Sequence, residues 1–340
     1  METKRFTEHD IKEAAAALRL GNLVSFPTET VYGLGANALS ETAVKQVYAV
    51  KGRPSDNPLI VHVSDKEMLE KYVDTLPKQA EELINHFWPG PLTLIVPMKK
   101  GTFSSTVTGG LNTVAFRMPD NALTLELIKE AGLPLVGPSA NTSGKPSPTT
   151  AEHVLHDLKG KIAGVLDGGS AEIGVESTVL DLTDSSSEPT ILRPGAVTKE
   201  ALEKVIGNVR IDQHLLSEKE TPKAPGMKYK HYSPEVPVWI VQNTPEDWNK
   251  AIKWAADQKL KAGIFAGKEI LQLFDGPLIE GYSFGMNTVE QAAKQLFSGL
   301  RALDETDVEL IFAPAFPETG LGEAYMNRLK KAANQKYFKN

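Results

Sequence analysis

The sequence predicts an α/β protein in two parts: a mixed, twisted sheet covered by helices, followed by a smaller three-layer α/β domain. Short apolar runs alternate with amphipathic stretches along the first two-thirds of the 340 residues, as in a sheet with helical cover. Two successive apolar runs around residue 185 are joined by a turn-rich segment, so we expect an antiparallel pair within the sheet. Beyond residue 237, strands and helices again alternate in a shorter block.

In the first part, each expected strand is a short run rich in valine, leucine or isoleucine. These strands span residues 23–26, 59–63, 92–96, 113–116, 133–136, 163–166, 179–182 and 190–192. Helical patterns occupy residues 9–19, 40–50 and 149–158. Thr7 and Ser40 are expected to be N-caps of the first two helices. Val44, Val47 and Tyr48 share one face of the second helix, as a helix packed on a sheet requires.

Residues 208–237 predict an extended connector, because they lack a sustained period and contain four prolines. The connector includes Pro-Gly-Met-Lys-Tyr-Lys-His-Tyr-Ser-Pro at 225–234, which is unlike a Gly/Ser spacer. A plain tether and a segment lying across a site both remain open. We therefore divide the chain into residues 1–207, the connector 208–237 and a C-terminal domain 238–340. In that domain we expect strands at 238–241, 262–265 and 308–312, and helices at 245–257, 289–303 and 321–333.

Composition excludes several classes of protein. The formal net charge is −6, and residues 1–207 alone carry 20 Lys and Arg against 26 Asp and Glu, so no general basic field draws the chain onto nucleic acid. The absence of cysteine excludes disulfides, thiolate nucleophiles and Cys-based zinc sites. No apolar run approaches the ~20 residues of a membrane span, and the charged N-terminus has no signal-peptide pattern. We expect a cytoplasmic protein.

Reactive side chains gather where predicted strands meet loops, the usual place for ligands in α/β sheets. Pro-Thr-Glu-Thr-Val-Tyr-Gly-Leu-Gly at 27–35 flanks a carboxylate with hydroxyls, and its glycines suit either the approach of a small polar ligand or a tight turn. Its carboxylate, Glu29, could also cap a helix. Lys-Gly-Arg-Pro-Ser-Asp-Asn-Pro at 51–58 suits a polyphosphate through Lys51 and Arg53, although a solvated turn is the competing interpretation.

Three further groups follow along the chain. Arg117 ends a predicted strand, where it forms either a structural ion pair or a contact with an anionic ligand. The hydroxyl-rich segment 137–148 follows another strand, and its prolines favour a rigid polar cradle. Ser177 precedes a strand, and Arg193 ends the next one before a Pro-Gly turn. Since no nucleophile motif, phosphate-binding loop or metal-ligand spacing is present, this set suits chemistry by positioning and charge neutralisation.

Taken in order, these motifs resemble the threonylcarbamoyl-AMP synthases, the YrdC-like family. FPTETVYGLG, KGRPSDNPL, TVAFRMP, GPSANTSGKPSPT and ESTV carry the resemblance across about residues 9–200. The PGMKYKHYSP connector and the second domain match the long form of these enzymes. The resemblance implies a YrdC-like catalytic domain, a connector over the active site and a smaller Rossmann-like domain.

The resemblance also implies roles for individual residues. L-threonine would be surrounded by Thr30, His62, Arg117 and Ser177, with Arg117 on its carboxylate. ATP would be held by Lys51, Arg53, Asn57, Thr113, Ser139, Asn141, Ser147 and Arg193, and by His231 and Tyr232 of the connector. Lys51 and Arg53 would also act in catalysis.

The implied reaction is nucleotidyl transfer, in which L-threonine, bicarbonate and ATP with Mg²⁺ give threonylcarbamoyl-AMP and pyrophosphate. The product would feed the threonylcarbamoyladenosine modification of tRNA position 37 through downstream transfer proteins. Direct binding of tRNA stays open. One alternative is an RNA-binding translation factor without catalysis. Another is carbamoyl transfer, as in hydrogenase-maturation proteins, but those use zinc-finger modules that a chain without cysteine does not have.

Overall fold

The chain divides into two compact units in a computed structural model that describes residues 2–184, 186–212 and 232–339. The first unit holds residues 1–143, 148–172 and 176–229. The second holds residues 230–340 together with two short segments, 144–147 and 173–175. The predicted connector lies mostly outside the described residues, so its course stays a prediction. In the described part, no helix combines the length and apolar character that crossing a membrane requires.

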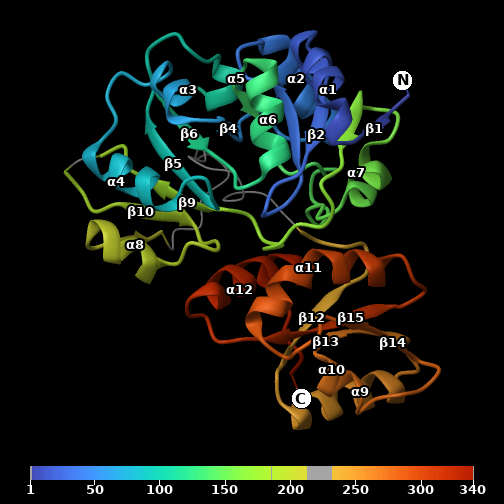
Figure 1. The fold of residues 1–340 in the computed structure, drawn as a ribbon. Coiled ribbons are helices and arrows are strands. Elements are labelled where there is room, and N and C mark those ends of the chain that lie inside the picture. The colour runs from blue at the N-terminus through green and yellow to red at the C-terminus, as the bar shows by residue number, and fades with distance from the viewer. Residues whose placement is uncertain (1, 185, 213–231, 340) are drawn as a thin grey trace. The chain divides into compact units, whose positions relative to one another are not determined.

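The first unit is built on a mixed sheet, as the sequence predicted (Figure 1). Its described strands lie in the order β1-β8-β2-β3-β7-β4-β6-β5-β9-β10-β11, with parallel and antiparallel pairs interspersed. The expected antiparallel pair is β9 with β10, in which Leu180 faces Ile191. The strands are β1 (Lys4–Phe6), β2 (Val24–Phe26), β3 (Gly33–Asn37), β4 (Ile60–His62), β5 (Leu92–Pro97), β6 (Thr113–Arg117), β7 (Leu135–Val136), β8 (Gly164–Leu166), β9 (Thr178–Asp181), β10 (Thr190–Arg193) and β11 (Arg210–Ile211).

Helices with well-formed caps cover this sheet. Thr7 caps the helical segment that leads into α1, and Ser40 caps α2 by accepting from the backbone N–H of Ala43, as predicted. Val44, Val47 and Tyr48 are all buried, so the predicted inner face of α2 is confirmed. The helices are η1 (Glu8–Asp10), α1 (Ile11–Arg19), α2 (Glu41–Lys51), α3 (Lys66–Glu70), α4 (Lys78–Phe87), α5 (Ser105–Thr108), α6 (Ala122–Ala131), α7 (Ala151–Leu158) and α8 (Lys199–Ile206).

The second unit is a parallel four-stranded sheet with helices on both faces (Figure 1). α9 and α10 lie on one face and α11 and α12 on the other, which is the predicted three-layer arrangement. The sequence missed β14 and the short helix α10. The elements are β12 (Val238–Gln242), α9 (Pro245–Asp257), β13 (Ala262–Ala266), α10 (Lys268–Leu271), β14 (Ile279–Ser283), α11 (Val289–Asp304), β15 (Leu310–Ala315) and α12 (Leu321–Ala332).

The Gly-x-Gly of the 27–35 motif has a packing role that the sequence did not reveal. Gly33 and Gly35 lie in β3, not in a tight turn. A Cβ on Gly33 would come within 2.7 Å of the Phe26 ring, and one on Gly35 within 2.5 Å of the Val24 carbonyl oxygen. Because any side chain would clash there, the glycines let β3 pack directly against β2. Of the two interpretations of these glycines, the tight turn is therefore wrong.

Candidate active site

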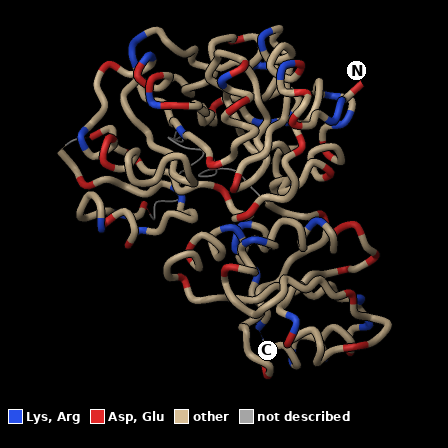
Figure 2. Tube along the Cα trace, viewed as in Figure 1, with Lys and Arg blue, Asp and Glu red and all other residues tan. Residues whose placement is uncertain are grey.

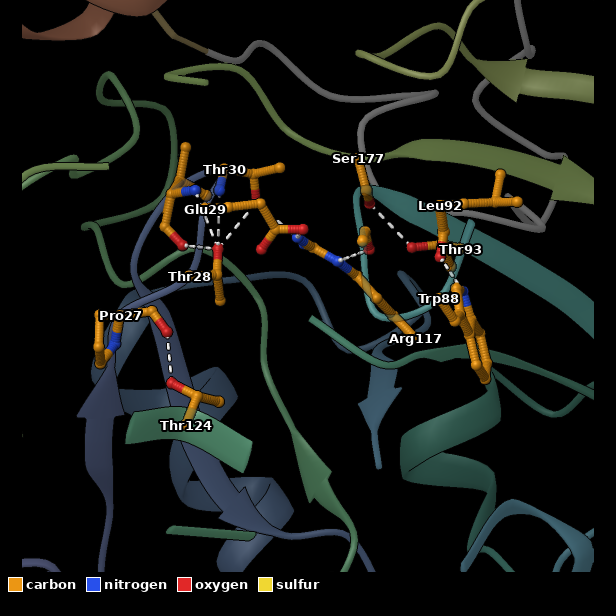
Figure 3. A network of polar contacts seen from close by, with 12 residues as sticks. Pro27, Thr28, Glu29, Thr30, Trp88, Leu92, Thr93, Arg117, Thr124 and Ser177 are labelled. Atoms are coloured by element: carbon orange, nitrogen blue, oxygen red, sulfur yellow. Dashed lines mark hydrogen bonds and ion pairs between the residues drawn. The ribbon is translucent and has the colours of Figure 1, made fainter. Parts of the chain in front are cut away.

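Arg117, at the end of β6, is the centre of a buried polar network (Figure 3). Its guanidinium donates from Nη1 to the Thr30 hydroxyl at 2.9 Å and from Nε to the Gly90 carbonyl at 3.3 Å. Its Nη2 lies 2.7 Å from the carboxylate of Glu29. The ion pair that the sequence offered as one role for Arg117 is therefore present, with Glu29 as its partner. The same guanidinium also contacts the hydroxyl of Thr30. Glu29 caps none of the described helices, so that expectation is wrong.

The loop between β2 and β3 presents these groups because Thr28 fixes its turn. The Thr28 hydroxyl donates to the Val31 carbonyl at 2.6 Å and accepts from the backbone N–H groups of Thr30 and Val31, both at 3.1 Å. It also lies 2.8 Å from the Thr30 hydroxyl. Such side-chain-to-backbone bonds are the usual stabilisers of a short threonine turn. The hydroxyls flanking Glu29 thus have separate tasks, one shaping the loop and one facing Arg117.

A second cluster joins Ser177, Thr93 and Arg193. The Ser177 hydroxyl lies 2.8 Å from that of Thr93 and accepts from Arg193 Nη2 at 3.0 Å. Arg193 Nε also donates to the Ser177 carbonyl at 3.1 Å. Gly195 permits this approach, since a Cβ there would lie 2.2 Å from the backbone nitrogen of Thr178. Thr93 was missed by the sequence analysis, although it is the one hydroxyl in an otherwise apolar strand and could have been found that way.

The strand register brings the two clusters to one edge of the sheet. Leu92 at the start of β5 pairs with Thr178 at the start of β9, and Leu94 pairs with Phe116 near the end of β6. Arg117 and Ser177 therefore stand beside the same end of β5 (Figure 3). His62, at the end of β4, is the register partner of Arg117.

His62 is a neutral imidazole in an apolar setting. Its ring packs edge-on against Phe26 with centroids 5.3 Å apart, and Gly137 makes room, since a Cβ there would lie 2.7 Å from the imidazole. Complete burial, with the nearby charge of Arg117, lowers its pKa to about 3. Its buried Nδ1 has no hydrogen-bond partner in the structure, which leaves one ring nitrogen available to a polar ligand.

The predicted nucleotide loops meet at Lys51, the last residue of α2. Its ammonium, on a residue only 2% exposed, donates to the carbonyls of Ser139 and Asn141, the latter at 2.6 Å. The solvated-turn interpretation is therefore wrong for Lys51. Arg53 Nη2 donates to the carbonyls of Asn57 and Pro58 at 3.4 and 3.3 Å. The two basic residues thus shape the loops in which Ser139, Asn141 and Asn57 lie.

The remaining predicted residues belong to other elements of the chain. Thr113 begins β6, opposite Pro97 and at the far end of the strand from Arg117. Ser147 belongs to the second unit. So does Tyr232, whose buried ring stacks on Phe297 with centroids 5.2 Å apart. His231 lies outside the described residues.

The fold and these polar clusters can now be compared with known proteins, first at the level of the family. The chain belongs to the Sua5–YciO–YrdC family, whose model, described as "Telomere recombination", matches residues 16–195. Within that class it belongs to the two-domain threonylcarbamoyl-AMP synthases, because a second model, "Threonylcarbamoyl-AMP synthase, C-terminal domain", matches residues 197–334.

Full-length relatives agree with that placement. The threonylcarbamoyl-AMP synthase of Bacillus subtilis is 48% identical over 98% of both chains. That of Pyrococcus abyssi is 46% identical over 99% of this chain and 97% of its own. The crystal structure of P. abyssi Sua5 complexed with L-threonine has a TM-score of 0.90 and 45% identity, covering 100% of this chain and 98% of that one. These names favour the synthase over the RNA-binding alternative.

Proposed function

We propose that this chain condenses L-threonine, bicarbonate and ATP into L-threonylcarbamoyl-AMP, releasing pyrophosphate and water. The single observation that carries the proposal is the buried Arg117 network, with the hydroxyls of Thr30 and Ser177 at one sheet edge, in a chain similar over its full length to named synthases. A guanidinium and hydroxyls in a water-poor site suit a small hydroxylated carboxylate. L-threonine is such a ligand, and one solved relative holds it.

The chemistry needs positioning rather than a nucleophilic side chain. The amine of L-threonine, once its ammonium form has lost a proton to solvent, takes up the carbon of bicarbonate as a carbamate, with loss of water. A carbamate oxygen then attacks the α-phosphorus of ATP, and pyrophosphate leaves. Lys51 and Arg53 are proposed to neutralise charge on the phosphate oxygens. Arg193, Ser139, Asn141, Asn57, Thr113, Ser147, Tyr232 and His231 are proposed to hold the nucleotide.

Mg²⁺ is proposed to enter with the nucleotide. In the parts of the chain that the structure describes, no group of three or more His, Asp or Glu side chains is placed to hold a metal. This fits a cation that is bound mainly by phosphate oxygens and water, as Mg²⁺ usually is in nucleotide sites. It would supply positive charge on the polyphosphate.

The product is proposed to pass to proteins that modify tRNA position 37. The charge distribution gives little support to direct tRNA binding, since Lys and Arg are intermixed with Asp and Glu along the trace of each unit (Figure 2). Binding driven by phosphate contacts would need a concentrated basic surface.

Pyrophosphate release tests the proposal. The full chain would be given ATP and Mg²⁺, with L-threonine and bicarbonate each omitted in turn, and the adenylate identified by mass spectrometry. We expect release only when both co-substrates are present. A protein that binds ATP but releases no pyrophosphate with both present contradicts the proposal, and a salt-dependent RNA titration then tests the binding alternative.

A further inference from the structure

Glu29 is a buried acid without a hydrogen bond. The residue is 6% exposed, and neither oxygen of its carboxylate accepts a hydrogen bond in the structure. Buried carboxylates are normally satisfied by several donors, because desolvation makes an unsatisfied charge costly. Arg117 supplies a nearby charge, with Nη2 2.7 Å from a carboxylate oxygen, but no hydrogen bond of good geometry. A purely structural pair of this kind usually forms parallel hydrogen bonds. The carboxylate is therefore placed to receive donors that the described part of the chain does not provide.

The pair places opposite charges side by side at the site edge. Arg117 already uses Nη1 on Thr30 and Nε on Gly90, so its orientation is fixed by the chain. Glu29 sits directly before Thr30 on a loop that Thr28 holds rigid. A fixed cation beside a fixed anion complements a molecule carrying a carboxylate and an ammonium on neighbouring atoms. An α-amino acid zwitterion has that arrangement, with three N–H donors on its ammonium.

We infer that Glu29 binds the α-ammonium group of the amino acid substrate while Arg117 binds its carboxylate. The inference rests on the proposed function and deepens it. It makes Glu29 a selectivity residue, because the site then requires a zwitterion and not merely a hydroxylated carboxylate. The ammonium would satisfy the carboxylate oxygens that are left without donors in the structure.

The test compares two ligands that differ only in the amino group. Binding of L-threonine and of (R)-3-hydroxybutanoate to the full-length protein would be measured by calorimetry. Hydrogen bonds to charged groups predict that the wild-type chain prefers L-threonine by about 10- to 150-fold. In Glu29→Gln the preference should fall to within about threefold, with the affinity for (R)-3-hydroxybutanoate little changed. A structural role alone would weaken both ligands together.

A matched control is Asp157→Asn. Asp157 is also a buried acid, but its carboxylate accepts from the backbone N–H of Thr142 at 3.0 Å, so this variant should keep the preference. If Glu29→Gln does not fold, Glu29→Asp takes its place and should keep only part of the wild-type preference. A wild-type chain that binds both ligands equally, or a Glu29→Gln variant that keeps the full preference, overturns the inference alone. A wild-type chain that binds no L-threonine overturns the proposed function as well.

Discussion

Among the described residues, the first unit buries 19 polar or charged side chains, whereas the second buries three: Ser147, Arg301 and Arg328. The difference does not follow from fold class, since both units are helix-covered sheets. It follows from what lies at the strand ends. In the first unit the strand ends carry Arg117, Ser177 and Arg193, while β12, β13 and β15 of the second unit are almost entirely apolar. Because burying polar groups costs stability unless they are bonded, their concentration favours the first unit as the one that binds ligands.

The largest expected effect tests whether the second unit depends on its apolar core. Trp248 in α9 is fully buried, and Trp248→Ala should lower the free energy of unfolding by about 3–5 kcal/mol. Urea denaturation, followed through the stacked Trp239 and Trp254 that remain, measures this. Binding of L-threonine to the folded variant should stay within about twofold of wild type. A large loss of L-threonine binding in a folded variant would contradict the view that the amino acid site depends on the first unit alone.

Lys51→Ala tests whether the buried polar residues of the first unit contribute to turnover. Removing one charge-neutralising donor should slow turnover about 10²- to 10³-fold, or ~2.7–4 kcal/mol of barrier, by analogy with an oxyanion-hole donor. Pyrophosphate release under saturating substrates measures it. Lys45→Ala is the control, because Lys45 lies on the same helix but is exposed and pairs with Glu41 at 2.8 Å. If Lys51→Ala turns over at a rate near that of the wild-type chain, Lys51 has no catalytic role.

Arg301→Gln tests what one of the few buried charges of the second unit contributes to stability and to ATP binding. Arg301 in α11 donates from Nε and Nη2 to the Pro146 carbonyl at 3.2 and 2.6 Å, and so holds the segment that carries Ser147. Loss of these bonds should cost about 1.5–3 kcal/mol of stability. Since Ser147 is a predicted ATP ligand, the KM for ATP should rise about tenfold while affinity for L-threonine is kept.

The control for that variant is Gln295→Ala on the same helix. Gln295 accepts from the Tyr282 hydroxyl at 2.8 Å and has no described bond to the segment 144–147. Its KM for ATP should equal that of the wild-type chain. An unchanged KM in Arg301→Gln as well would show that the segment does not depend on this contact.

The smallest effect concerns pH. The pKa of His62 is lowered from 6.5 to about 3 by burial and by Arg117, so the unfolded chain takes up its proton more readily than the folded one. Stability from this group is present above pH 6.5 and is lost as pH falls towards 3. Between pH 6.5 and 4.5 the wild-type chain should lose about 2 kcal/mol more than His62→Asn. Chemical denaturation at both values measures the difference, and equal losses would mean that His62 titrates normally.

The sequence by itself determined the elements whose signals are local. The helix α9 spans the predicted residues 245–257, and α2 follows its predicted Ser40 cap and apolar face. The short elements β14 and α5 were not predicted, because a few apolar positions do not distinguish a strand or a helical turn from a loop. The longer helices α4, α6 and α8 were not predicted either, although Asn121 caps α6 and Thr198 caps α8. The ordered motifs also sufficed to assign the family.

Only the tertiary structure decided which polar residues meet. Glu29 lies 88 positions from Arg117, and Thr93 lies 84 positions from Ser177, so neither pairing leaves a periodic trace in the sequence. The roles of Gly33 and Gly137 were hidden in the same way, because each is set by the ring of Phe26, which reaches it across the sheet. Local propensity depends on neighbours within a few residues, whereas charge pairing and close packing depend on the strand order that brings distant segments together.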